Sequence, residues 1–252
     1  MEAYNPNEHP LITIVTSDSN PLGKIFPKRK NYQPGVLHTG IFYVTFTYSM
    51  QNLYFQIKQL TKYQVLLLGV PKQQNLYQGK ISSKKMNQLM ENAITRTKED
   101  VGWNPFGLSL TLIDIDFGDI PNFILNTAKE VLDFLITLDP ELVHCAILIL
   151  PSNSQRYDIS KKSWHVYLKV SNANDSTVKL YAETLQSICW IKGLGNIKLS
   201  KSGSMLVRQV FDIVVFSPER IVIEKCFSDD ESVIFHEIEP LIQEGIAREL
   251  YE

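Results

Sequence analysis

One stretch of the chain, residues 110–119 with the sequence LTLIDIDFGD, constrains the fold more than any other. Up to its second aspartate it is almost entirely apolar or β-branched, a pattern typical of a strand buried on both faces. Because side chains alternate across a strand, Asp114 and Asp116 share one face. Two neighbouring carboxylates at the end of a buried strand repel each other and lose hydration, and a divalent cation with oxygen ligands would remove that cost. The alternative is that one aspartate caps the strand while the other is solvated.

The composition is that of a globular chain. Among 252 residues, 44% are hydrophobic and 21% are charged, which suits one large domain or two small ones. No apolar run approaches the roughly 18 residues of a membrane helix, and no secretory signal is expected at the N-terminus, so the protein is predicted to be intracellular and without a membrane partner. Cys145, Cys189 and Cys226 are isolated and odd in number, which favours reduced core cysteines over disulfides or a zinc site.

The net charge of −2 is unevenly distributed along the chain. From Glu224 to Glu252 there are nine acidic and two basic residues, a charge of −7, which leaves +5 for residues 1–223. A mildly basic body is compatible with a polyanionic partner such as nucleic acid, and equally with scattered, solvated lysines.

Hydrophobic periodicity predicts strands and helices that interleave without strict alternation, which favours an α+β class over a doubly wound parallel sheet. Strands are expected at residues 11–16, 40–46, 63–70, 110–117, 145–150 and 164–170, with extended segments at 211–216 and 220–224. Helices are expected at residues 49–62, 120–138 (beginning near Pro121) and 177–190, with helix-compatible stretches within 80–97 and 237–252 and a polar loop at 151–162. Neither a G-x-G-x-x-G nor a G-x-x-x-x-G-K phosphate loop occurs.

Two further stretches carry polar side chains suited to phosphate. Ser163 and His165 share one face of a predicted strand, and a hydroxyl with an imidazole can donate to phosphate oxygens. The alternative for His165 is a satisfied core histidine. Arg208 and Asp212 are four residues apart, so they lie on one side of either a helix or a strand. One alternative is a plain ion pair between Arg208 and Asp212. The other is that Asp212 is a third carboxylate for the metal ions and that Arg208 or Lys201 contacts phosphate.

The ordered set of D-x-D, S-x-H and a later apolar residue followed by Asp resembles the archaeo-eukaryotic primase superfamily. The closer similarity is to the primase-polymerases of plasmids and other mobile elements, and it covers most of the chain. It includes residues 12–16 with Leu22-Gly23-Lys24, and residues 93–98 before the aspartate strand. The most specific match is residues 199–206 with Arg208, Asp212 and residues 216–220. The zinc-binding insert of cellular primases is absent.

This resemblance implies a primase catalytic core, in which an N-terminal α/β module packs on an RNA-recognition-motif-like sheet with the active site between them. The single catalytic domain, residues 1–252, would comprise an N-terminal module at 1–105, a catalytic module at 106–228 and an acidic tail or linker start at 229–252. The implied activity is that of a template-dependent nucleotidyltransferase, a DNA primase and polymerase, in the replication of a plasmid or mobile element.

Carried over to matching positions, the resemblance makes Asp114, Asp116 and Asp212 the ligands of two Mg²⁺ or Mn²⁺ ions. It makes Ser163 and His165 binders of the nucleotide's phosphates. Lys201 and Arg208 are further nucleotide-binding candidates, and the candidates without an assigned role are Arg96, Arg220, Ser152 and Ser154. The implied partners are a single-stranded DNA template with its primer, an NTP or dNTP, and a helicase or a C-terminal helical domain.

Two other functions would use some of the same residues. A D-x-D glycosyltransferase would hold the metal of a sugar nucleotide with Asp114 and Asp116, but it needs neither the S-x-H pair nor Asp212. A non-catalytic module that binds single-stranded nucleic acid would keep the fold and the basic loops, although the intact set of three acids argues against it.

Overall fold

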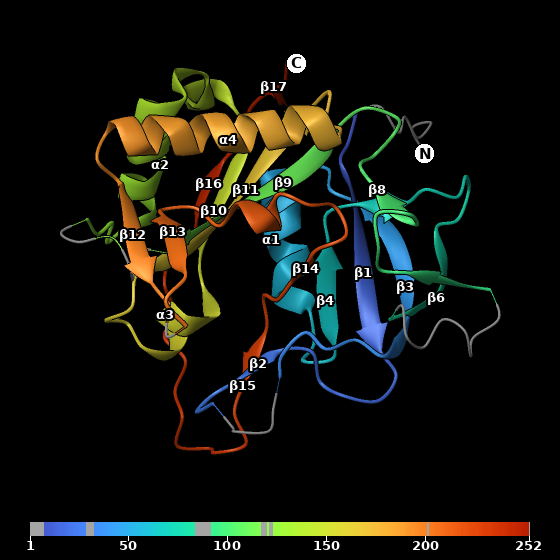
Figure 1. Ribbon diagram of the computed structural model, residues 1–252. Helices are drawn as coiled ribbons and strands as arrows, with labels where there is room; N and C mark the ends of the chain where they lie inside the picture. The colour runs from blue at the N-terminus through green and yellow to red at the C-terminus, as the bar shows by residue number, and fades with distance from the viewer. Residues whose placement is uncertain are drawn as a thin grey trace.

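The protein is described from a computed structural model, which defines residues 8–28, 33–83, 92–116, 120, 123–200 and 202–251. The chain forms a mixed α+β structure in which two main sheets lie on either side of a central helix (Figure 1). The first sheet is built mainly by the N-terminal part of the chain. The second carries the aspartate strand and is covered on its far face by two longer helices.

The first sheet has six strands in the order β14-β4-β1-β3-β6-β7. Its strands are β1 (Leu11–Ser17), β3 (Thr39–Phe46), β4 (Gln64–Leu67), β6 (Gln78–Ser82), β7 (Ala93–Thr95) and β14 (Ile221–Val222). The central strand β1 is buried on both faces, because Ile12 and Ile14 face the second sheet while Val15 packs into a separate core. The sheet therefore has two hydrophobic faces, one of which is shared with the rest of the molecule.

The second sheet is built around β9 (Ser109–Asp116), β10 (Ile147–Pro151) and β11 (Ser163–Ser171), which are neighbours in the order β10-β11-β9 and pair antiparallel. At its edges, β16 (Leu241–Gln243) pairs with β10 and β17 (Arg248–Glu249) pairs with the end of β11. An isolated antiparallel bridge joins Ile115 to Phe211, so the chain after residue 209 runs along the outer edge of β9.

The helices α2 (Ala128–Leu138) and α4 (Asp175–Ile191) cover one face of this sheet, where they bury residues such as Ile113 and Val166. The helix α1 (Met50–Gln59) lies against the other face, where Leu110, Leu112 and Tyr167 pack with it and with β1. The strand β9 thus separates two cores. On the α1 side the apolar residues end at Leu112, and the next residue on that face is Asp114.

Each long helix begins at a residue that caps it. The side chains of Ser49, Thr127 and Asn174 accept hydrogen bonds from the first-turn amides of α1, α2 and α4, and Asn174 forms a full capping box with Thr177. The amides of Met50 and Gln51 also donate to the carboxylate of Glu244, at 3.1 and 2.9 Å. A residue from the C-terminal segment therefore completes the start of α1.

The remaining elements are short. Three two-stranded pairs are formed by β2 (Lys24–Ile25) with β15 (Cys226–Phe227), β5 (Val70–Pro71) with β8 (Val101–Gly102), and β12 (Gly195–Leu199) with β13 (Met205–Gln209). A short helix, α3, spans Asn153–Tyr157, and 3-10 turns span Pro140–His144 and Ile213–Val215.

Several sequence expectations need correction. The helix expected from residue 120 begins at Ala128, since Thr127 caps it and residues 123–126 are not helical; Pro121 lies outside the described residues. The loop expected at 151–162 contains α3, which Ser152 caps. The extended segment expected at 211–216 contains a 3-10 turn that Asp212 caps.

Of the two helix-compatible stretches, the polar middle of 80–97 falls at residues 84–91, outside the described part of the chain, and the residues on either side, 80–82 and 93–95, are strands. The second stretch, within 237–252, is not helical at its described residues. These residues instead form β16 and β17, and Leu241 of β16 and Leu250, which follows β17, pack against the core of the second sheet. Pro240 and Gly245 interrupt the near-helical spacing of this stretch, and Gly245 lies so close to the His144 carbonyl that a Cβ would be only 2.3 Å from it.

All three cysteines are buried and none forms a disulfide. Within the described ranges, no helix is both long enough and apolar enough to cross a membrane.

Candidate active site

The pairing of β9 with β11 brings four of the predicted site residues together. In the antiparallel register Asp114 lies opposite His165, and Asp116 lies opposite Ser163. Residues opposite each other in such a pair project to the same face, so two carboxylates, a hydroxyl and an imidazole meet at one end of the sheet. The face is the one that packs on α1 further along the strands, where Leu110, Leu112 and Tyr167 are buried.

Asp212 joins this group through the backbone. Its amide donates to the carbonyl of Asp114 at 3.1 Å, and the amide of Asp116 donates to the carbonyl of Val210 at 3.1 Å. Val210 and Phe211 are buried in the core under α2 and α4, which fixes this stretch beside β9. The three acids predicted as a set are therefore adjacent, although Asp212 is far from the other two in sequence.

The three aspartates line one open cavity of about 470 Å³. Its wall also includes Arg208 and Gln209 of β13, and Gln186 of α4. One carboxylate oxygen of Asp212 accepts from the amide of Val214 at 2.9 Å, which is the cap of the 3-10 turn. Among the described residues, no three His, Cys, Asp or Glu side chains are already arranged as a metal-binding group. The acids share a cavity, and their donors are carboxylate oxygens, the type preferred by Mg²⁺ and Mn²⁺.

The electrostatics of Asp114 reflect this crowding. Its side chain is 31% exposed. Burial raises the pKa of its carboxyl above the usual value, and the charges of Asp212 and Asp116 raise it further, while His165 and Lys24 lower it in part. Because burial and neighbouring negative charges make ionisation of this carboxyl group unfavourable, a bound cation would stabilise its ionised form strongly.

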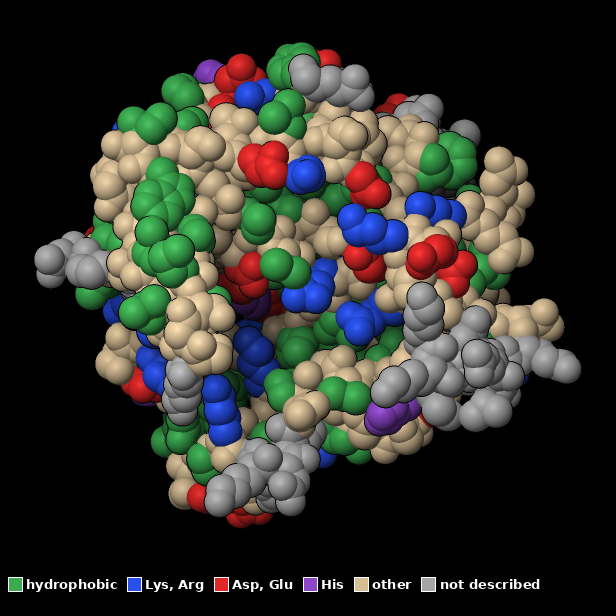
Figure 2. All heavy atoms as spheres, viewed as in Figure 1, with side chains coloured by type: hydrophobic (Ala, Val, Ile, Leu, Met, Phe, Trp, Pro, Cys, Tyr) green, Lys and Arg blue, Asp and Glu red, His purple; other side chains and the backbone are tan. Residues whose placement is uncertain are grey.

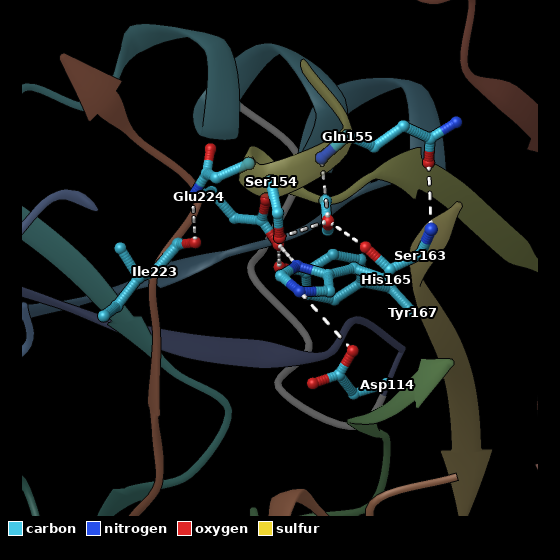
Figure 3. A network of polar contacts seen from close by, with 10 residues as sticks. Asp114, Ser154, Gln155, Ser163, His165, Tyr167, Ile223 and Glu224 are labelled. Carbon is cyan, nitrogen blue, oxygen red and sulfur yellow. Dashed lines mark hydrogen bonds and ion pairs between the residues drawn. The ribbon is translucent and has the colours of Figure 1, made fainter. Parts of the chain in front are cut away.

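His165 lies between two acids, as Figure 3 shows. Its Nδ1 is 2.5 Å from Oε1 of Glu224, and its Nε2 is 3.8 Å from Oδ1 of Asp114. The ring is almost fully buried, and burial by itself disfavours the imidazolium. The charge and hydrogen bond of Glu224, together with the charge of Asp114, outweigh that cost and raise the pKa of His165 above its ordinary value. The alternative of a satisfied core histidine describes only the Nδ1 side of this ring, because the Nε2 side faces Asp114.

Glu224 and Tyr167 were not predicted as site residues. The Tyr167 hydroxyl donates to the same Glu224 oxygen at 2.5 Å, and both side chains are buried. Burial disfavours the charged carboxylate, but His165, the two hydrogen bonds and Lys24 outweigh it and lower the pKa of Glu224. Tyr167 could have been found from its period-2 relation to His165. No local pattern marks Glu224, which comes from a different part of the fold.

Lys24 was not among the predicted site residues, yet its ammonium acts electrostatically on Asp114, His165 and Glu224. The pairing of β2 with β15 places it, since Lys24 lies opposite Cys226 and its amide donates to the carbonyl of Lys225 at 2.9 Å. The site therefore contains a lysine whose position depends on the segment that follows Glu224.

Ser163 belongs to a serine cluster at the start of α3. Its hydroxyl is hydrogen-bonded to that of Ser152, which is 3.2 Å from the hydroxyl of Ser154. The amide of Ser163 donates to Oε1 of Gln155 at 3.3 Å. Ser152 therefore contacts Ser163 directly, and Ser154 joins the cluster through Ser152; Figure 3 shows Ser154 and Ser163 on the two sides of this cluster.

The basic candidates are distributed differently. Arg208 lines the acid cavity, whereas Arg96 and Arg220 are close to each other: burial lowers the pKa of Arg96, the charge of Arg220 lowers it further, and Glu219 partly offsets both. Lys201 lies outside the described residues. Figure 2 shows Lys and Arg side chains gathered around a hollow on this face, with acidic and histidine side chains visible inside it.

Comparisons with known proteins give no relative for this chain: no protein-family model, no curated protein and no solved structure matches it significantly.

Proposed function

We propose that this chain is a template-dependent nucleotidyltransferase of the primase-polymerase type, acting with two divalent cations on DNA. The observation that carries the proposal is the shared cavity of Asp114, Asp116 and Asp212, with the His165 ring directed at Asp114 from the neighbouring strand. Two of these acids come from one strand and the third from a segment joined to that strand only by tertiary structure. A chance D-x-D at a strand end does not account for the third acid.

The order of elements around the site supports the same proposal. Apart from the short helix α3 between β10 and β11 and the β12–β13 pair after α4, the chain from residue 109 runs β9-α2-β10-β11-α4, and the segment around Phe211 then returns to the edge of β9. This is a β-α-β-β-α-β order with the strands arranged β10-β11-β9-Phe211 and both helices on one face, as in an RNA-recognition-motif-like sheet. The open face meets the N-terminal sheet and α1, which is the arrangement expected of a primase catalytic core.

In the proposed reaction Asp114, Asp116 and Asp212 would hold the two ions, Mg²⁺ or Mn²⁺. When bound, the ions would lower the pKa of the primer 3′-hydroxyl and neutralise charge on the triphosphate. Ser163 and His165 contact the phosphates, and the raised pKa of His165 favours the charged ring, in which both nitrogens donate. Lys24, which acts electrostatically on Asp114, and Arg208, which lines the acid cavity, add positive charge near the acids. Positioning and charge neutralisation supply most of the acceleration in phosphoryl transfer.

We further propose that the partners are a primer on a single-stranded template, an NTP or dNTP, and a helicase or helical domain, inside the cell of the element's host. The mildly basic body, +5 over residues 1–223, would follow a nucleic-acid backbone without reading its sequence. The division into modules at residues 105 and 228 stays a prediction. The two sheets share one hydrophobic core, so we expect the modules to fold together.

A primer-extension assay tests the proposal. The full chain is incubated with a labelled primer–template, Mg²⁺ or Mn²⁺, and either NTPs or dNTPs. We expect template-directed extension that depends on the metal and is lost in Asp114→Asn. An exposed acid on α2, Asp133, which pairs with Lys129, provides the matched control Asp133→Asn, and this variant should extend normally.

The same experiment separates the two alternatives. A glycosyltransferase would leave the primer unchanged and would hydrolyse or transfer from a sugar nucleotide in the presence of the metal. A non-catalytic module would retain the labelled DNA without extending it. Absence of extension with both nucleotide sets and both metals would contradict the proposal.

A further inference from the structure

The environment of Glu224 is unusual for a carboxylate. Its residue is only 5% exposed, and a single oxygen, Oε1, accepts from both the His165 Nδ1 and the Tyr167 hydroxyl at 2.5 Å (Figure 3). A buried carboxylate is tolerated when its charge is compensated by such partners. The Glu224 carboxylate is therefore fixed in position, and it in turn fixes the His165 ring and the Tyr167 hydroxyl.

This contact determines which nitrogen of His165 is available. An ionised carboxylate can only accept, so the proton of the His165–Glu224 hydrogen bond is on Nδ1. The other nitrogen, Nε2, points toward Asp114, and the 3.8 Å between them exceeds a direct hydrogen bond. Nε2 is thus the ring atom directed at the acids, and its orientation is set from behind by Glu224.

Glu224 reaches the ring from the other half of the fold. The strand just before it, β14, pairs with β4 of the first sheet, and the strand just after it, β15, pairs with β2. The carbonyl of Ile223 also accepts from the Asn153 side chain at 2.7 Å, beside the serine cluster. Fixed on both sides, the backbone at residue 224 carries its carboxylate across to β11 of the second sheet.

We propose that Glu224 is the positioning residue of this site: it fixes His165 with Nε2 toward the acid cavity, where that nitrogen contacts a phosphate oxygen of the bound nucleotide. Tyr167 holds the Glu224 carboxylate in place for this role. The identity of the ligand rests on the proposed nucleotidyl-transfer function, whereas the orientation of the ring does not. Glu224 itself touches neither the nucleotide nor the metal ions.

The orientation is tested by nuclear magnetic resonance on protein labelled with ¹⁵N in its histidine rings, at one fixed pH. A proton shared between Nδ1 and a carboxylate gives a strongly deshielded signal, which His165→Gln should remove and so assign. We expect the signal in the wild type, its loss in Glu224→Gln, and its retention in Glu239→Gln. Glu239 is a matched control because it is an exposed acid that lines the same 340 Å³ cavity as Glu224.

The functional part is tested by titrating the same proteins with a non-hydrolysable dNTP in the presence of Mg²⁺, and by steady-state extension kinetics. We expect Glu224→Gln to weaken nucleotide binding about tenfold, the scale of one charge-assisted hydrogen bond. The nucleotide KM should rise in parallel, with kcat at saturating nucleotide within about twofold of the wild type.

Tyr167→Phe should lower the melting temperature but change nucleotide affinity less than Glu224→Gln, because the Glu224–His165 contact remains. A purely structural role would reduce stability in both variants and leave nucleotide affinity unchanged.

If Glu224→Gln does not fold, Glu224→Asp replaces it: the charge stays but the shorter side chain withdraws from Nδ1, and the deshielded signal should weaken together with nucleotide affinity. A deshielded signal that persists in Glu224→Gln would overturn the proposal, as would its loss with no change in nucleotide affinity. A wild type that binds no nucleotide at all, but whose signal is lost in Glu224→Gln, would instead contradict the proposed function and leave the orientation by Glu224 established.

Discussion

The amide of Asp212 donates a hydrogen bond to the carbonyl of Asp114, at 3.1 Å, and this contact places the third acid of the site beside the first. The two residues are far apart in the sequence, because β10, β11 and α4 lie between them along the chain. Phe211, 4% exposed, packs under α2 and anchors the contact from the core side. The acid cavity therefore depends on the fold of the second sheet as a whole.

Metal binding should be measurable without any reaction. Binding to the native state alone raises stability in proportion to the logarithm of ligand concentration. We expect Mn²⁺ to raise the melting temperature of the wild type and to have a much smaller effect on Asp114→Asn and Asp212→Asn. Asp133→Asn should respond like the wild type. An equal response of all four proteins would place the ions elsewhere.

Asp114 should also give the metal-free protein a characteristic pH dependence. Its pKa is raised on folding, so the native state binds more protons than the unfolded state between the unfolded and folded pKa values. Its contribution to stability is therefore lost as the pH rises through that window. At pH values just above the ordinary aspartate pKa, the free energy of unfolding of the wild type should fall as the pH rises. We expect this fall to be smaller in Asp114→Asn, as measured by urea denaturation. A variant whose pH dependence matched the wild type would contradict this assignment.

His165→Ala should weaken nucleotide binding by roughly 1.5–3 kcal/mol, the scale of a charge-assisted hydrogen bond, while Mn²⁺ binding survives. The variant also leaves Glu224 with one fewer buried partner, so a loss of thermal stability is expected in addition. A nucleotide titration and a melting curve on the same sample separate the two effects. Reduced stability with unaltered nucleotide affinity would show that His165 is only a core residue.

Lys24→Met should weaken binding of a triphosphate more than that of a nucleoside, because the ammonium acts on the anionic part of the site. The nearby exposed Lys28 provides the control: Lys28→Met removes the same charge four residues further along the chain, outside β2. We expect the control to bind both ligands normally at physiological salt, where exposed charges are screened. Equal effects of the two variants on triphosphate binding would show that Lys24 acts only through the overall charge of the protein and not from a specific position in the site.

The C-terminal segment should contribute to stability through Glu244. Both of its carboxylate oxygens accept from the first amides of α1, a position favoured by the helix dipole. We expect Glu244→Ala to lower the free energy of unfolding by about 0.5–1 kcal/mol. Glu237→Ala, which removes an exposed acid that only approaches Lys58 at 3.9 Å, should have little effect. Similar losses in both variants would argue against the cap.

The sequence predicted the parts of this structure that depend on local pattern. Alternation and β-branched residues located β1, β3, β9 and β11, and the same alternation correctly placed Asp114 with Asp116 and Ser163 with His165. The helical stripes located α1 and α4 within a few residues. These features could be predicted because a strand or helix that buries one face has apolar residues at regular intervals in its sequence.

The features that were missed depend on contacts between distant segments. Glu224 becomes a partner of His165 only because β14 and β15 pair with strands from the first half of the chain. The apolar residues at 238–250 were predicted as helical because their spacing is ambiguous in a short stretch, and pairing with β10 and β11 decides in favour of strands. The four-residue spacing to Arg208 left Asp212 as either an ion-pair partner or a third carboxylate, and the resemblance implied a metal ligand; the structure places Asp212 in the acid cavity.

Nucleotide incorporation by Asp212→Asn, compared with the wild type and Asp133→Asn, is the most direct test of the three-acid site. The assay follows metal-dependent extension of a labelled primer on a template, with folding checked by the melting curve of each protein. The proposed function predicts that Asp212→Asn folds normally and incorporates no nucleotide, as Asp114→Asn and Asp116→Asn also should, while Asp133→Asn extends like the wild type. Extension by folded Asp212→Asn at a rate near that of the wild type would contradict it.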